Sequence, residues 1–168
     1  MATKLTKAQE TRKRLLEDFE FYSKHAVKIR TKDGEVISFT LNRVQKKLLK
    51  AITEQYLTTG KIRVVILKAR QQGLSTFVSA WLYFYLSQHS AKKGFVVAHV
   101  ADSTKTLFDL YKRVHTLVPE LLRPQTKYSS RRELTFDILD TGLTVATAGG
   151  DGIGRSETIT HAHCSEVA

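Results

Sequence analysis

Apolar residues recur with helical spacing over residues 7–26, which predicts an N-terminal helix. Residues 27–40 alternate apolar and charged side chains on both sides of a polar turn at 32–34, and this pattern predicts a β-hairpin. Asn42 then offers a favourable N-cap, and Gly60 a stop signal, for the helix between them. The N-terminal part of the chain is therefore expected to contain a helix, a hairpin and a second helix.

A short apolar run at 64–67 predicts a strand, and the lack of polar positions in it indicates burial on both faces. A polar loop around Gly73 follows, and the apolar segment at 76–87 predicts a buried helix. Strands and helices continue to alternate beyond it, which predicts an α/β fold built on a mainly parallel sheet flanked by helices. The further strands are expected at 95–98, 134–138, 143–146 and 158–164, and a further helix at 103–118.

Charge adds to this picture a preference for a polyanionic partner. The 168-residue chain has 27 Lys and Arg residues against 16 Asp and Glu residues, a formal net charge of +11. Clustered cations bind phosphate backbones by releasing the counterions around them. A solvated surface that keeps the protein soluble is the alternative interpretation of this charge. Cys164 is the only cysteine, which excludes an internal disulfide and suits a reducing compartment. No signal peptide or bilayer-spanning apolar stretch is expected, so we predict a soluble, intracellular protein with no membrane partner.

The strand, loop and helix over residues 64–87 are the elements of a phosphate-binding loop, in which backbone N–H groups and a helix N-terminus face the anion. The usual pattern is G-x-x-x-x-G-K-[ST], and Gly73 and Ser75 match it, with Ser75 placed to hold Mg²⁺. Leu74 stands where the lysine belongs, and Lys68 stands where the first glycine belongs. An ordinary strand-to-helix turn with a polar cap is the alternative interpretation.

The stretch from Leu67 to Phe77 resembles the deviant Walker A loop of terminase large subunits, the DNA-packaging motors of phages and prophages. Several members of that family move the lysine to the front of the loop, where Lys68 stands, and carry an arginine within it, where Arg70 stands. The resemblance implies that ATP and Mg²⁺ bind at this loop and that both cations take part in catalysis. It also implies nucleotide contacts from the residues that close the loop and begin the helix: Gln71, Gln72, Gly73, Leu74, Ser75 and Thr76.

Three further segments resemble terminase motifs in the expected order. One is the strand-helix unit at residues 97–113, which is similar to the segment that follows the Walker A helix. Residues 41–45 are similar to the adenine-binding glutamine motif shared with superfamily 2 helicases, and Gln45 would contact the adenine edge through its amide. Residues 154–155 and 163–168 together are similar to the block that ends with the Walker B strand, where Glu166 would be the general base or orient the attacking water. An ordinary surface glutamate is the alternative interpretation of Glu166. Ser165 replaces the usual Walker B aspartate and would contact Mg²⁺ weakly, through water.

Arg155 follows a glycine-rich loop, and an arginine in this region of terminase rings resembles a finger that acts on the neighbouring subunit's ATP. A solvated arginine on a surface loop is the alternative. His161 and His163 alternate on the last expected strand and should share one face, but the sequence shows no partner cluster that would complete a zinc site with them.

The resemblance covers roughly residues 35–168 and implies a P-loop NTPase fold of the additional-strand catalytic-glutamate type. It divides the chain into an N-terminal helix and hairpin extension, residues 1–40, and a partial P-loop ATPase domain, residues 41–168, incomplete at its C-terminus. In ATPases of this class the strand after Walker B lies between the Walker A and Walker B strands. We therefore expect a gap or an unusual pairing beside residues 64–67, with exposed apolar backbone edges there.

The function implied is ATP hydrolysis that drives double-stranded DNA into a viral capsid in the host cytoplasm. The implied partners are duplex DNA, a portal protein, a small terminase subunit and further copies of the chain in a homo-oligomeric ring. A superfamily 2 helicase-like translocase is a second interpretation, although such an enzyme would show a standard Gly-Lys-Thr loop and a DEAD- or DEAH-like Walker B. A catalytically impaired DNA-binding fragment of a terminase is a third, favoured by Leu74 and Ser165.

Overall fold

The computed structural model describes residues 6–31, 33–67, 71–149 and 158–166. The N-terminal region forms α1 (Lys7–Glu17) and α2 (Phe19–Ala26) rather than one helix, because the Asp18 side chain accepts the backbone N–H of Phe21 and starts α2 anew. The predicted hairpin is confirmed as β1 (Lys28–Arg30) paired antiparallel with β2 (Val36–Ser38).

The second predicted helix is confirmed as α3 (Arg43–Thr59), with both of its predicted ends. Asn42 is the N-cap, since its side chain accepts the backbone N–H of Gln45. Gly60 is the C-cap in the left-handed conformation, with φ 66°, which glycine adopts without a steric penalty. Local cap chemistry therefore sets the length of α3.

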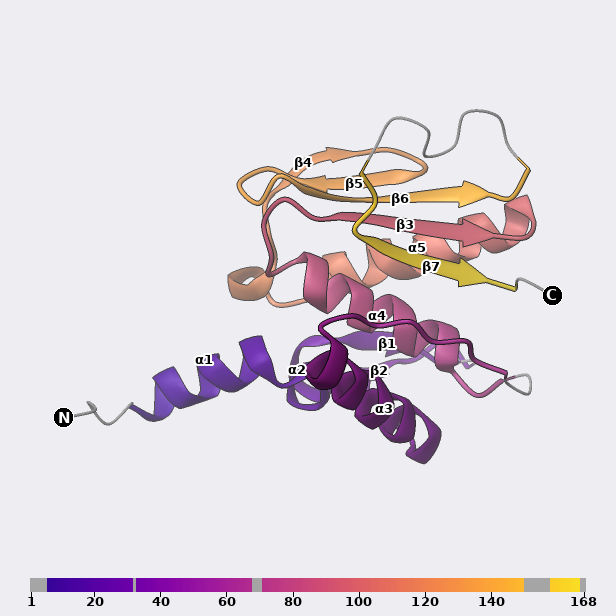
Figure 1. The fold of residues 1–168 in the computed structure, drawn as a ribbon. Helices are drawn as coiled ribbons and strands as arrows, with labels where there is room; N and C mark the ends of the chain where they lie inside the picture. The colour runs from indigo at the N-terminus through magenta and orange to yellow at the C-terminus, as the bar shows by residue number, and fades with distance from the viewer. Residues whose placement is uncertain (1–5, 32, 68–70, 150–157, 167–168) are drawn as a thin grey trace.

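A five-stranded sheet forms the centre of the α/β fold, in the order β4-β5-β6-β3-β7 (Figure 1). Strand β3 pairs parallel with β6 and with β7, whereas β4/β5 and β5/β6 are antiparallel, so the sheet is mixed rather than mainly parallel. The reason is the short connections between β4, β5 and β6, which permit only antiparallel pairing. The strand bounds are β3 (Lys93–Ala98), β4 (Thr126–Ser129), β5 (Glu133–Phe136), β6 (Thr141–Thr147) and β7 (His161–Ser165).

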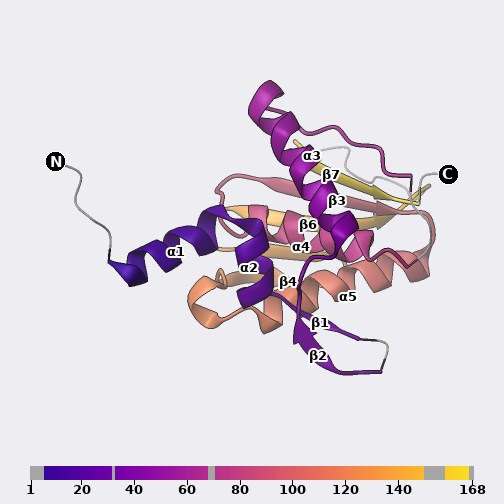
Figure 2. The same ribbon diagram turned by 90° about the horizontal axis from the view of Figure 1, so that it is seen from below.

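The helices α4 (Leu74–Leu86) and α5 (Ala101–Leu117) lie on the same face of the sheet, and a short 3-10 helix at Glu120–Leu122 follows them (Figures 1 and 2). Helix α4 is apolar almost all round, as predicted, because it packs against the sheet on one side and α2 on the other. The ring of Phe19 in α2 contacts the rings of Phe77 and Phe84, with centroids 5.5 and 5.4 Å apart. The N-terminal extension thus shares one core with the sheet. No helix in the described ranges is long and apolar enough to cross a membrane.

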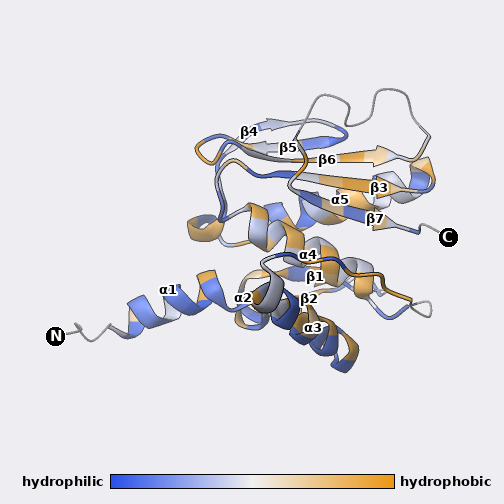
Figure 3. Ribbon diagram, in the orientation of Figure 1, coloured by the Kyte–Doolittle hydropathy of each residue, from blue (hydrophilic) through white to orange (hydrophobic). Residues whose placement is uncertain are grey.

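The strand predicted at 64–67 is wrong: these residues belong to no strand, and three of their four apolar side chains are exposed, whereas Ile66 is half-buried. Figure 3 shows this apolar segment in orange. Val65 is 90% exposed and Leu67 is 98% exposed. A strand requires a hydrogen-bonded partner, and the edge strand β7 pairs only with β3 among the residues that the structure describes. The gap or unusual pairing expected beside residues 64–67 stays a prediction, because these residues form no strand for a neighbouring strand to flank.

Candidate functional site

The N-terminus of α4 is preceded by a turn with two residues in the left-handed region. Gln71 has φ 65° and Gly73 has φ 67°. Gly73 is the N-cap of α4, and among the described residues no side-chain hydrogen bond caps the helix. A helix of 13 residues that begins without a side-chain cap leaves its first backbone N–H groups available to an anion. A glycine N-cap preceded by a left-handed residue is the local geometry that the structure shows at this point.

Glycine is favoured at position 73 for two independent reasons. A side chain is strained at φ 67°. A Cβ atom would also lie 2.8 Å from Nε2 of Gln45, which is closer than real Cβ contacts. Gly73, the residue that corresponds to the glycine of a phosphate loop, therefore stands where the backbone angle and the contact with Gln45 both favour glycine.

Gln45 holds this turn from the first turn of α3. Its Nε2 donates to the carbonyl oxygen of Gly73 at 2.9 Å, and its Oε1 accepts the backbone N–H of Asn42 at 2.9 Å. Asn42 adds a third link, because its Nδ2 donates to the carbonyl oxygen of Gln72 at 3.2 Å. We call this set of three hydrogen bonds the α3 latch. Sequence reasoning selected Gln45 and Gly73 separately, and the structure brings them together.

The latch bears on the prediction that Gln45 reads adenine. The side chain is 3% exposed, and both its nitrogen and its oxygen are engaged with backbone groups. In this structure it positions the loop, and adenine recognition by the same amide stays a prediction that requires the side chain to become accessible.

Leu74, Ser75 and Thr76 are the first three residues of α4. Ser75 and Thr76 are half-buried, and their place in the first turn suits contact with a phosphate or with a metal ion beside it. Leu74 is 5% exposed, so a lysine at this position would lose the hydration of its ammonium group. Burial therefore gives a physical reason why the usual lysine is absent here.

The second predicted part of the site is the end of β7. Ser165 is the last residue of the strand and is half-buried, and Glu166 follows it, exposed, with φ 60°. A glutamate in the left-handed region stores backbone strain of about 1–3 kcal/mol, and such strain is found preferentially at functional sites. The carboxyl ends of β3 and β7 lie at the same end of the molecule as the N-terminus of α4 (Figure 1).

The three predicted cationic residues Lys68, Arg70 and Arg155 lie outside the described residues. Their contacts with a phosphate stay predictions. What the structure places is the backbone on the C-terminal side of Arg70, which turns directly into α4.

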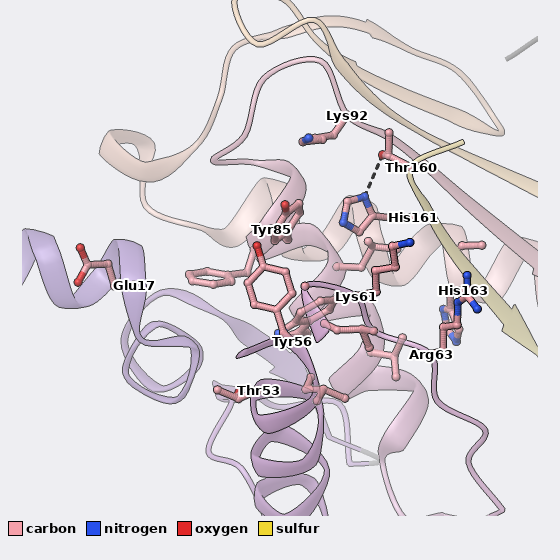
Figure 4. Close-up of a pocket in the computed structure, with 18 residues that line it drawn as sticks. Glu17, Thr53, Tyr56, Lys61, Arg63, Tyr85, Lys92, Thr160, His161 and His163 are labelled. Atoms are coloured by element: carbon pink, nitrogen blue, oxygen red, sulfur yellow. Dashed lines mark hydrogen bonds between the residues drawn. The ribbon is translucent and has the colours of Figure 1, made fainter. Parts of the chain in front are cut away.

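A groove of about 690 Å³ that sequence reasoning missed lies between α3, α4 and the open edge of β7 (Figure 4). Aromatic side chains and cations line it, among them Tyr56, Trp81, Tyr85, Lys61, Arg63 and Lys92. His161 and His163 also line it, which confirms that they share one face of the strand. Within the described ranges, no three His, Cys, Asp or Glu side chains are grouped to hold a metal ion.

Burial controls the protonation of the two histidines. The pKa of His163 is lowered to about 4 by burial, and its Nδ1 makes no hydrogen bond within the described part of the chain. The pKa of His161 is lowered by burial first and then by the nearby charges of Lys92 and His89. Both rings are therefore neutral near pH 7. Sequence alternation could identify the shared face but not the groove, which depends on α3 and α4.

Comparison of the chain with protein-family models and with curated proteins found no match.

Proposed function

We propose that this chain is an ATP-hydrolysing DNA motor subunit of the terminase large-subunit type, with the N-terminus of α4 as its phosphate-binding site. The observation that carries the proposal is the uncapped start of α4, which follows a left-handed turn at Gln71 and Gly73. An uncapped helix N-terminus after a glycine turn is the arrangement that phosphate loops use. Two cations in the same short loop, Lys68 and Arg70, add positive charge where a triphosphate would lie.

Each residue of the site has a role in this proposal that fits its chemistry. Backbone N–H groups from residues 73–76 would hold the phosphates, and Ser75 would contact Mg²⁺, which neutralises charge on the β- and γ-phosphates when it is bound. Ser165 would bind the metal only through water, because a hydroxyl supplies no charge. Glu166 would accept a proton from the attacking water or orient it. Arg155 would act on the nucleotide of a neighbouring copy in a ring.

Lys68 supplies the decisive test, because the side chain of Leu74 has no donor and is buried. Lys68→Ala should weaken binding of a fluorescent ATP analogue with Mg²⁺ and lower the ATPase rate of the assembled protein by about two to three decades, the usual cost of losing a transition-state charge contact. Lys127→Ala is the matched control, since Lys127 is an exposed cation on β4, at the far edge of the sheet. Equal effects of the two substitutions would refute the assignment of the phosphate loop.

The catalytically impaired DNA-binding fragment is the second candidate function. It is favoured by Leu74, whose buried side chain offers no donor where a lysine is usual, and by Ser165, which is neutral where the Walker B carboxylate is expected. This candidate predicts binding of duplex DNA without measurable binding of the ATP analogue. The nucleotide-binding measurement on the unmodified protein therefore separates the two candidates before any variant is made.

A further inference from the structure

Helix α3 carries a compact group of cations on one face. Arg43, Lys46, Lys47 and Lys50 are all exposed and line a shallow open depression of about 490 Å³. Their spacings of three, four and seven residues are those that bring side chains to the same side of a helix. Glu54, near the far end, is the only acidic residue in α3. We call this surface the α3 basic face.

The charge of the α3 basic face is only partly compensated. Lys46 lies 2.7 Å from Glu20, and Lys50 lies 3.7 Å from Glu54. All four side chains of these pairs are about half or more exposed, so each pair contributes at most about 1 kcal/mol and is readily exchanged for a phosphate. Arg43 and Lys47 form no ion pair within the described part of the chain.

The dimensions of the α3 basic face fit a nucleic-acid backbone better than a small anion. Arg43 and Lys50 are seven positions apart, or roughly 10 Å along a helix that rises about 1.5 Å per residue. One strand of duplex DNA advances about 3.4 Å per phosphate along the axis, so the face spans roughly three phosphates of that strand. A small anion would instead need converging donors, and the depression is open.

Duplex rather than single-stranded nucleic acid is favoured by the residue types on this face. Single-strand sites combine cations with aromatic side chains on which bases stack. The lining of the depression is formed by the four cations and contains no aromatic residue. Contacts from Lys and Arg alone bind the backbone without reading the bases.

We propose that the α3 basic face docks on the phosphodiester backbone of duplex DNA. The proposal deepens the motor function above and rests on its DNA-binding part. The α3 latch places this surface one helical turn from the candidate phosphate loop, because Asn42 and Gln45 belong to the same end of α3 as Arg43. DNA contact and the nucleotide site would thus be joined by a single rigid helix.

The test measures the affinity of the protein for a fluorescently labelled DNA duplex of about 20 base pairs. Binding is detected by fluorescence anisotropy, without nucleotide, at salt concentrations of about 50–200 mM. The double variant Arg43→Glu with Lys47→Glu removes the two uncompensated cations. Loss of two phosphate contacts lowers the slope of log affinity against log salt by about 1.8 and the affinity by roughly 10- to 100-fold near 100 mM salt. Glutamate is favourable near a helix N-terminus, so α3 should remain folded, which circular dichroism checks.

The control variant Lys105→Glu with Lys127→Glu makes the same change in net charge at exposed positions on α5 and β4. This variant should retain its affinity for the duplex within about threefold, and the slope of log affinity against log salt should stay the same. Charges outside the docking surface are separated from the DNA and screened by salt, so their loss has little effect. An equal loss in both variants would overturn the proposal, since attraction would then be a property of the whole charge. Binding to phosphatidylserine vesicles but not to DNA would overturn it in favour of a membrane surface.

Failure of this proposal is distinguishable from failure of the proposed ATPase. No duplex binding by the unmodified protein would overturn the docking surface, whereas nucleotide binding that depends on Lys68 would still support the phosphate loop. Duplex binding that is lost in the α3 variant, together with no nucleotide binding, would support the docking surface and reject the ATPase.

Discussion

We predict that the side chain of Gln45, the centre of the α3 latch, contributes substantially to the free energy of unfolding. In Gln45→Ala the backbone N–H of Asn42 and the carbonyl oxygen of Gly73 both lose their partner, at about 1 kcal/mol each. The side chain is 3% exposed, so the loss of its buried methylene adds about 0.8 kcal/mol. The expected decrease in the free energy of unfolding is therefore about 2–3 kcal/mol, measured as a shift of the urea midpoint at constant slope.

Gln45→Glu separates the two halves of the latch. A glutamate retains the acceptor for the N–H of Asn42 but turns a carboxylate toward the carbonyl oxygen of Gly73, which repels it. Burial raises the pKa of such a carboxyl above its unfolded value, so the protonated form, which can donate to Gly73, is favoured in the folded state. Stability should be greatest below the unfolded pKa and fall as pH rises through the folded pKa. A variant with no such dependence would contradict the geometry of the latch.

Helix α3 offers a matched control in Gln55. Its Oε1 accepts the backbone N–H of Arg63 at 2.7 Å, and its Nε2 donates to the carbonyl oxygen of Arg63 at 3.1 Å, but these bonds are exposed. Gln55→Ala should cost about 1 kcal/mol or less and leave nucleotide binding unchanged. If Gln45→Ala loses no more free energy of unfolding than Gln55→Ala, burial does not strengthen the contribution of Gln45 and this prediction is refuted.

Three further predictions concern the core, the exposed segment and the groove. Gly94→Ala would place a Cβ atom 2.5 Å from Cδ1 of Leu86 and 2.9 Å from Cδ1 of Leu143, so thermal unfolding should show a loss of about 1–3 kcal/mol, and an unchanged Tm would contradict this packing. Leu67→Lys should change stability by less than about 0.5 kcal/mol, because the side chain is 98% exposed; a larger loss in urea would mean that the segment is buried in solution. The pKa of His163 is about 4 in the folded protein and 6.5 in the unfolded chain. Its contribution to stability is therefore fully present above about pH 6.5 and is lost progressively as pH falls toward 4. His163→Leu should flatten that fall relative to the unmodified chain, and an unaltered pH profile would exclude the histidine as its source.

Local signals in the sequence were sufficient for much of the fold. Asn42 and Gly60 specify both ends of α3 through their own side chain and backbone preferences, which do not depend on distant residues. Asp18 carries a signal of the same kind, but the continuous apolar pattern across it hid the start of α2. Residues 126–129, all exposed, carry no alternation, so β4 could not be predicted, and with it the antiparallel part of the sheet.

The wrong prediction of a strand at 64–67 and the missed contact between Gln45 and the loop have the same physical origin. Residues 64–67 have the composition of a buried strand, but composition cannot supply the neighbouring strand that hydrogen bonding requires. The latch likewise joins Gln45 to Gly73 across 28 positions, a distance over which no periodicity acts. The residue types of the candidate site were therefore predictable, whereas the engagement of Gln45 with the loop and the groove beside β7 required the fold.

The exposed segment at 61–67 should make the protein susceptible to limited proteolysis at this point. Its backbone takes part in no strand, and Lys61 and Arg63 are exposed within it, so limited trypsin digestion should cut there first. The two pieces should nevertheless stay together, because the rings of α2 pack into α4 and the α3 latch crosses the cut. A native gel would then show one species and a denaturing gel two, so the nicked protein would behave as a noncovalent pair that can be taken apart and recombined from separately produced halves.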